Sequence, residues 1–273
     1  MSKENTMNKG EDKAMKRRDF GKGMAAVLVS TVLDGHETQA QETHSQGTQL
    51  QVGMLLYPQL TLLDLLGPQT VLSAHAKVHL VWKTRDMVRT DTGIGIQPNS
   101  TLSECPKDLD VLFVPGGPGM IPVMKDPEVL AFLADRGASA KYITSVCSGS
   151  VILGAAGLLR GYKATSHWAA TDLLPLFGAE IGEGRVVTDR NRITGGGVTA
   201  GIDFGLVLLA KLRGDDVAKI TQLAMEYDPQ PPFDAGSPKR AGAAMTQQFL
   251  ASLEPLNRQT RQIAAEIAAG ELR

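Results

Sequence analysis

The chain has 273 residues, of which 42% are hydrophobic and 21% charged, and its formal net charge at pH 7 is −1. This composition lacks the concentrated positive charge of nucleic-acid-binding proteins, and two cysteines exclude a disulfide-stapled scaffold and a multi-cysteine zinc site. No apolar run approaches the roughly 18 residues that span a bilayer. What remains is an enzyme or a binding domain that acts on a small molecule.

Residues 1–40 have the pattern of an export signal. Arg17 and Arg18 stand just ahead of an apolar stretch over 23–33, and small residues follow it. A charged region, an apolar region of about 7–15 residues and a small-residue exit define such signals, and the arginine pair resembles a twin-arginine signal. We therefore predict a periplasmic protein with a polar linker over 41–50. The alternative is a basic tail before a short helix, which would leave the protein in the cytoplasm.

Between residues 51 and 230, short apolar runs alternate with amphipathic stretches, which indicates one folded domain. The expected strands are 51–57, 78–83, 110–115 and 142–146, with paired strands over 185–194, and the expected helices are 63–75, 127–137 after Asp126 as N-cap, 151–159, 200–212 and 215–227. Continuous apolar strands between helices predict a parallel sheet covered on both faces, which is a three-layer α/β/α sandwich. In such sheets the site lies at the carboxyl ends of the strands.

A proline-rich loop and a helical extension follow over 231–273. The apolar side chains that fall at roughly helical spacing there are Met245, Phe249, Leu253, Leu256, Ile263 and Ile267. We interpret this extension as a packing arm or a dimer element and not as part of a site.

The strongest chemical signal is Cys147. A predicted strand runs directly into it, and Ser148, Gly149 and a helix of small residues follow. A residue on such a sharp turn is exposed and strained at the positive end of a helix, which lowers a thiol pKa and enriches the nucleophilic thiolate. We predict that Cys147 is a nucleophile, the alternative being a small buried hydrophobe. Cys105 lacks this setting and is predicted to lie in a surface loop.

Two further features follow predicted strands. Asp64 stands among leucines, where burial without a cation would raise its pKa and make it a proton donor; the alternative is a helix N-cap. A turn containing Gly116 and Gly117 exposes backbone N–H groups that can hold a developing negative charge. Neither a GxGxxG fingerprint nor a P-loop lysine is present, so the turn is not interpreted as a nucleotide site.

These motifs together resemble the ThiJ/PfpI superfamily over about residues 50–230. The Asp-Leu-x-Gly-Pro pattern that begins at Asp64, the Pro-Gly-Gly turn and the Ser-Val-Cys-Ser-Gly-Ser run are similar to one branch, as are the segments 164–168 and 194–203. That branch contains isonitrile hydratases and the sensor domains of certain helix-turn-helix regulators. The resemblance implies a flavodoxin-like, class I glutamine-amidotransferase-like fold and a homodimer.

The resemblance also assigns roles to residues. It implies Cys147 as the nucleophile, Asp64 as its paired acid and an assisting hydroxyl on Ser148, where the protease-like and glyoxalase-like branches tend to have histidine. Gly116 and Gly117 are expected to position the adduct. His167 is a candidate binding residue, with a packed structural histidine as the alternative. No metal and no cofactor are expected, and the expected partner is a small-molecule substrate, with neither nucleic acid nor a membrane span.

The implied reaction adds water to an isonitrile, R–NC, and gives an N-substituted formamide through a cysteine thioimidate. The alternatives are another cysteine-dependent hydrolase, a glyoxal-processing enzyme, a non-catalytic ligand-binding domain and a redox-sensing thiol. A disulfide between Cys105 and Cys147 would silence the site, and their predicted places at different strand ends argue against it. Trp82 and Trp168 are possible pocket-lining residues, with core packing as the alternative.

Overall fold

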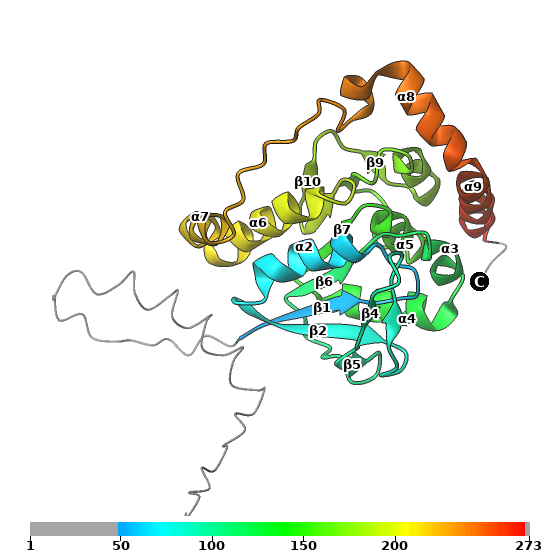
Figure 1. Ribbon diagram of the computed structural model, residues 1–273. Helices are drawn as coiled ribbons and strands as arrows, with labels where there is room; N and C mark the ends of the chain where they lie inside the picture. The colour runs from blue at the N-terminus through cyan, green and yellow to red at the C-terminus, as the bar shows by residue number, and fades with distance from the viewer. Residues whose placement is uncertain (1–48, 271–273) are drawn as a thin grey trace, which may run out of the picture. The chain divides into compact units, whose positions relative to one another are not determined.

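A seven-stranded sheet forms the centre of the protein. The computed structural model describes residues 49–270, so the predicted export signal and nearly all of the predicted linker lie outside the described residues (Figure 1). The strands of the sheet are β1 (Leu50–Leu55), β2 (Ala76–Trp82), β5 (Ser100–Thr101), β6 (Val111–Val114), β7 (Tyr142–Val146), β10 (Val186–Asp189) and β11 (Arg192–Gly195). Their order is β10-β11-β7-β6-β1-β2-β5, and all neighbours are parallel except the antiparallel pair β10 and β11.

Helices cover both faces of this sheet. One layer holds α2 (Leu62–Leu72) and α6 (Ala200–Arg213), with α7 (Asp215–Ala224) packed against α6. The other layer holds α3 (Met120–Met124), α4 (Pro127–Ser139), α5 (Gly149–Ala155) and the 3₁₀ helix η1 (Thr171–Phe177). The three-layer α/β/α sandwich predicted from the sequence is therefore confirmed.

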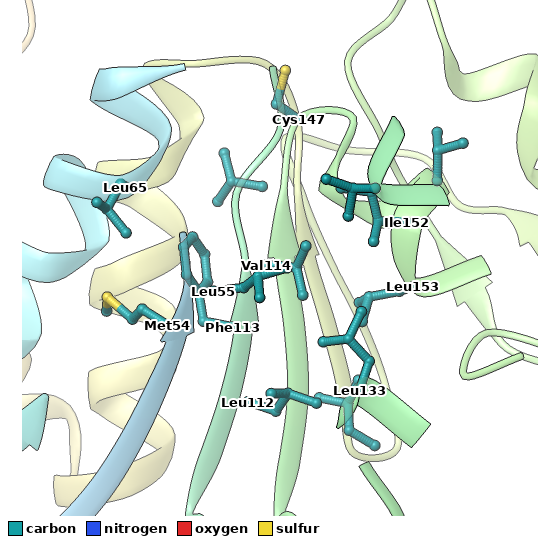
Figure 2. Close-up of a cluster of buried hydrophobic side chains, with 14 of the residues drawn as sticks. Met54, Leu55, Leu65, Leu112, Phe113, Val114, Leu133, Cys147, Ile152 and Leu153 are labelled. Carbon is teal, nitrogen blue, oxygen red and sulfur yellow. The ribbon is translucent and has the colours of Figure 1, made fainter. Parts of the chain in front are cut away.

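Apolar side chains fill the space between the sheet and each helical layer. All four residues of β6 are buried, as expected for a strand covered on both faces. Figure 2 shows Phe113 on the same side of the strands as Leu65 of α2, and Leu133 of α4 and Ile152 of α5 on the other side. On the α2 side, Phe113 packs against Phe204 of α6 with ring centroids 5.6 Å apart. Alternate residues of a central strand thus anchor the two layers.

The strand order creates a switch point beside β1. From β1 the chain adds β2 and β5 on one side, then crosses over and adds β6, β7 and β11 on the other side. The order reverses between β1 and β6, and the carboxyl ends of β1, β6 and β7 lie next to each other there. Open α/β sheets bind ligands at such a switch point.

The C-terminal extension is helical, as predicted, and forms α8 (Pro238–Ser252) and α9 (Glu254–Ala269). Helix α9 packs against η1, α3 and α5, whereas α8 has no buried residue. The sequence did not predict the short pairs β3 (Val88–Arg89) with β4 (Gly95–Ile96) and β8 (Lys163–Ala164) with β9 (Glu180–Ile181). Within residues 49–270, every helix is too short or too polar to cross a membrane.

Cys105 is buried, so the prediction of a surface-loop residue is wrong. Only 3% of it is exposed, because the loop that carries it folds against β1. A side chain at Gly53 would come within 3.5 Å of its Sγ, and Arg136 donates a 2.9 Å hydrogen bond to its carbonyl oxygen. Cys105 precedes β6 and Cys147 follows β7, and both are free thiols in this structure.

Candidate active site

Cys147 stands on a strained turn between β7 and α5. Its φ is 58°, in the left-handed region that side chains other than glycine rarely adopt. Its N–H donates to the carbonyl oxygens of Gly195 and Gly196 at 3.1 and 2.9 Å, and its carbonyl oxygen accepts from the hydroxyls of Ser166 and Ser150. These contacts hold the residue in a conformation that it would otherwise avoid. Figure 2 shows the thiol above the carboxyl ends of the strands.

Asp64 lies in the first turn of α2 and is fully buried. Its Oδ2 accepts a 2.9 Å hydrogen bond from the N–H of Gly116, and its Oδ1 has no hydrogen-bond partner among the described residues. The helix begins after Thr61, so the alternative that Asp64 is the N-cap is wrong. Burial raises the pKa of Asp64 to about 7, although the neighbouring Cys147 thiol and the Gly116 N–H act in the opposite direction.

The thiol of Cys147 is also buried, with 7% of the residue exposed. Burial raises the pKa of this thiol, and the charge of Asp64 raises it further. The N–H groups of Ser148 and Val198 favour the thiolate but do not outweigh those two effects. The sequence-based expectation of an exposed thiol with a lowered pKa is therefore wrong, because burial beside a carboxylate dominates over the turn. The thiol keeps its proton at neutral pH, whereas the carboxyl, with a pKa of about 7, is close to half ionised there, so the pair can share one proton.

The glycine turn after β6 fixes this pair to its neighbours. The N–H of Gly117 donates a 3.1 Å hydrogen bond to Oγ of Ser148. The N–H of Gly116 donates its own hydrogen bond, of 2.9 Å, to Oδ2 of Asp64. A Cβ at Gly116 would lie 2.5 Å from the Ser148 nitrogen and 2.9 Å from Asp64 Oδ2, so only glycine fits. Both N–H groups predicted to hold a developing negative charge thus bind protein side chains in this structure.

A small cavity of about 160 Å³ opens beside the thiol. The sandwich contributes Cys147, Ser148 and His167 to its wall. The C-terminal extension contributes Phe249 of α8 and Leu256 of α9, together with Leu253 and Asn257. The interpretation of this extension as no part of a site is therefore corrected: α8 and α9 turn their apolar side chains over the cysteine.

His167 lies at the edge of the same cavity and is half-buried. Its Nδ1 accepts the N–H of Ala169 at 3.2 Å, and burial lowers the pKa of the ring. The histidine is hydrogen-bonded and packed, and it also borders the cavity, so the structure combines the two interpretations. Trp168, which is 36% exposed, stacks against it, whereas Trp82 packs against the core.

Sequence reasoning missed the part that Val198 and the four cavity residues of the C-terminal extension play in the site. The segment 194–203 was recognised as a motif, but nothing in its pattern showed that the Val198 N–H is directed at the thiol. Among residues 49–270, no three His, Cys, Asp or Glu side chains gather in a way that could hold a metal ion.

Comparisons with known proteins identify the family of this chain. The model of the DJ-1/PfpI family matches residues 51–211. The chain belongs to the DJ-1/PfpI family. The isonitrile hydratase of Pseudomonas putida is 48% identical over 222 residues, which cover 81% of this chain and 97% of that protein. A crystal structure of a ThiJ/PfpI family protein from Pseudomonas syringae superposes with a TM-score of 0.78 at 48% identity, covering 86% of this chain and 99% of that one.

More distant relatives match a smaller part of the chain. A glutathione-independent glyoxalase of Caenorhabditis elegans is 26% identical over 130 residues, which cover 47% of this chain and 69% of that protein. The resemblance inferred from the sequence motifs, including the flavodoxin-like fold, is confirmed.

Proposed function

We propose that this protein is an isonitrile hydratase, which adds water to R–NC and releases R–NH–CHO. The observation that carries the proposal is the pairing of the Cys147 thiol with the buried carboxyl of Asp64 beside a small cavity. The 48% identity to the Pseudomonas putida isonitrile hydratase over most of both chains supports a hydro-lyase. A proton donor and a nucleophile directed at one carbon atom are what this reaction requires.

In the proposed first step, the proton shared by Cys147 and Asp64 moves to the terminal carbon of the isonitrile. The Sγ–C bond forms at the same carbon and leaves a thioimidate, R–N=CH–S–Cys147. A carboxyl group with a pKa of about 7 suits this transfer, because near neutral pH it both accepts and releases a proton readily. The raised thiol pKa means that the thiolate forms as the proton leaves, and not in the resting enzyme.

In the proposed second step, water attacks the thioimidate carbon. The Asp64 carboxylate takes one proton from that water and passes it to the nitrogen of the intermediate. The C–S bond then breaks, R–NH–CHO is released, and the remaining hydroxyl proton returns to the pair. We assign Gly116 and Gly117 the task of positioning Asp64 and Ser148, because their N–H groups bind those side chains. The Ser148 hydroxyl and His167 contact the substrate from the cavity wall.

The proposal is tested by the turnover of cyclohexyl isocyanide, followed as the appearance of the formamide. The wild type, Cys147→Ala and the matched control Cys105→Ala are compared under reducing conditions. We expect turnover by the wild type and by Cys105→Ala, and none by Cys147→Ala. A folded, reduced wild type that turns over no isonitrile would overturn the proposal, and conversion of methylglyoxal instead would assign the site to glyoxal chemistry.

The location and the assembly of the enzyme belong to the same proposal. Export to the periplasm rests on the arginine pair, and replacing Arg17 and Arg18 by lysine is expected to retain the protein in the cytoplasm, as cell fractionation would measure. A homodimer rests on the family resemblance, and light scattering of the purified chain tests it.

A further inference from the structure

A second cavity, of about 230 Å³, lies next to the cysteine cavity. Trp168 forms part of its wall, and the segment from Ala235 to Phe249, at the start of the C-terminal extension, supplies the rest. None of the residues that line it is charged, and Met245 and Pro238 are among them. We refer to this space as the outer cavity and to the space beside Cys147 as the inner cavity.

Three stacked rings separate the two cavities. The centroids of Trp168 and Phe249 are 5.4 Å apart, those of His167 and Trp168 are 5.5 Å apart, and those of His167 and Phe249 are 6.3 Å apart. His167 borders the inner cavity, Trp168 borders the outer cavity, and Phe249 borders both. The Phe249 ring is therefore a shared wall.

The helix that carries this wall is loosely held. Helix α8 has no buried residue, and its backbone breaks from helical geometry at Gly242, whose φ is 79° and ψ 167°. Phe249 itself is 42% exposed. Elements with few buried contacts open at low free-energy cost, so the ring can move without disturbing the sandwich.

The inner cavity is too small for a large substrate. Its volume is below the roughly 300–1,000 Å³ of typical ligand pockets, whereas the two cavities together reach that range. An isonitrile carbon that contacts Cys147 must direct its substituent away from the thiol, and the uncharged outer cavity lies beyond Phe249.

From this geometry we infer that the outer cavity is a subsite for the substituent of the isonitrile, with Phe249 as the partition that controls access to it. The inference rests on the proposed function and names its substrate class: isonitriles with extended, uncharged alkyl or aryl substituents. Phe249 and Met245 are then the residues that determine how large a substituent the enzyme accepts.

The test compares kcat/KM for 2-naphthyl isocyanide with that for methyl isocyanide. Met245→Trp fills the outer cavity, and we expect it to lower the naphthyl-to-methyl ratio about tenfold. Phe249→Ala removes the partition and is expected to raise the ratio by a similar factor. Leu250→Ala, on the same helix but outside both cavity walls, is the matched control and is expected to leave the ratio unchanged. An unchanged ratio in Met245→Trp would overturn the inference.

A second readout does not depend on hydratase activity. Cys147 is alkylated with iodoacetamide and with N-benzyliodoacetamide, and the rates are measured by mass spectrometry of the peptide that contains Cys147. Met245→Trp is expected to slow alkylation by N-benzyliodoacetamide more than alkylation by iodoacetamide. Phe249→Ala is expected to raise the rate with N-benzyliodoacetamide relative to that with iodoacetamide. If the wild type turns over no isonitrile but these selectivities hold, the subsite stands and the proposed function fails. If turnover depends on Cys147 but neither ratio responds, the subsite is wrong and the function stands.

Discussion

The turn at Cys147 and helix α8 border the same cavity, yet they are held in place by different means. Four hydrogen bonds to neighbouring backbone and hydroxyl groups fix both the N–H and the carbonyl of Cys147, which is buried. Helix α8 has no buried residue and carries exposed apolar side chains, among them Met245 and Leu250. The reacting thiol therefore lies on a rigid part of the backbone, whereas the cavity wall that contacts the substituent lies on a helix that can move more easily.

The largest effect is expected from a substitution in the buried region around Cys147. Asp64→Asn keeps an oxygen that can accept the Gly116 N–H but removes the acidic proton. We expect turnover of cyclohexyl isocyanide to fall about 10²- to 10⁴-fold, the range for loss of a general acid, with the fold intact by circular dichroism. Turnover within a factor of two of the wild type would remove Asp64 from the mechanism.

The next effect concerns the core beneath the turn. Phe113→Ala empties the space that the ring fills against Phe204, and we expect the free energy of unfolding to fall by about 3–5 kcal/mol. Urea denaturation followed by far-UV circular dichroism measures this loss. A cost below 1 kcal/mol would mean that the layers between β6 and α6 repack easily, which would weaken the contrast between the two regions.

Asp64 also links stability to pH. Its pKa rises from the usual 3.8 to about 7 in the folded protein, so the folded state keeps a proton that the unfolded chain releases between those values. This contribution is fully present below about pH 4 and is lost as the pH rises through 7, which lowers the free energy of unfolding by roughly 1–4 kcal/mol. Urea denaturation at several pH values gives the free energy of unfolding of the wild type and of Asp64→Asn. The same dependence of this free energy on pH in both proteins would contradict the expectation.

The smallest effect is expected on α8. Leu250→Ala, on the exposed helix, should change the free energy of unfolding by less than about 0.5 kcal/mol. The same urea measurement, with Phe113→Ala as the reference, decides this. A loss comparable to that of the core variant would show that α8 is tightly docked, and the difference between the two regions would disappear.

The features that depend on residues adjacent in the sequence were predictable. The apolar run over 110–115 indicated a strand buried on both faces, and β6 is such a strand. The strained turn at Cys147 followed from a strand that runs into Ser-Gly-Ser, and its φ of 58° agrees. The sequence also placed Asp64 and the glycine turn at the carboxyl ends of strands, where the structure brings them to Cys147.

What could not be predicted depends on contacts between distant segments. The burial of Cys147 is set in part by α8 and α9, which lie about a hundred residues further along the chain. Their apolar spacing indicated a packed face but not the surface that it meets. Cys105 was misplaced for the same reason, since its loop is polar at the sequence level and becomes buried where it meets β1 and Arg136.

The order of strands in the sheet also bears on how the chain folds. Val52 of β1 pairs with Val78 of β2, which follows closely in the sequence, and with Val111 of β6, which comes much later. Pairings between distant residues slow folding, because a long loop must close before they form. The segment with β1, α2 and β2 can therefore form early, whereas Asp64 meets Gly116 and Cys147 only after β6 and β7 have docked. A nascent chain without those two strands has the carboxyl group but no partner for it. The Cys147 turn also needs the carbonyl groups of Gly195 and Gly196 at the end of β11, so a complete catalytic site forms only late in synthesis.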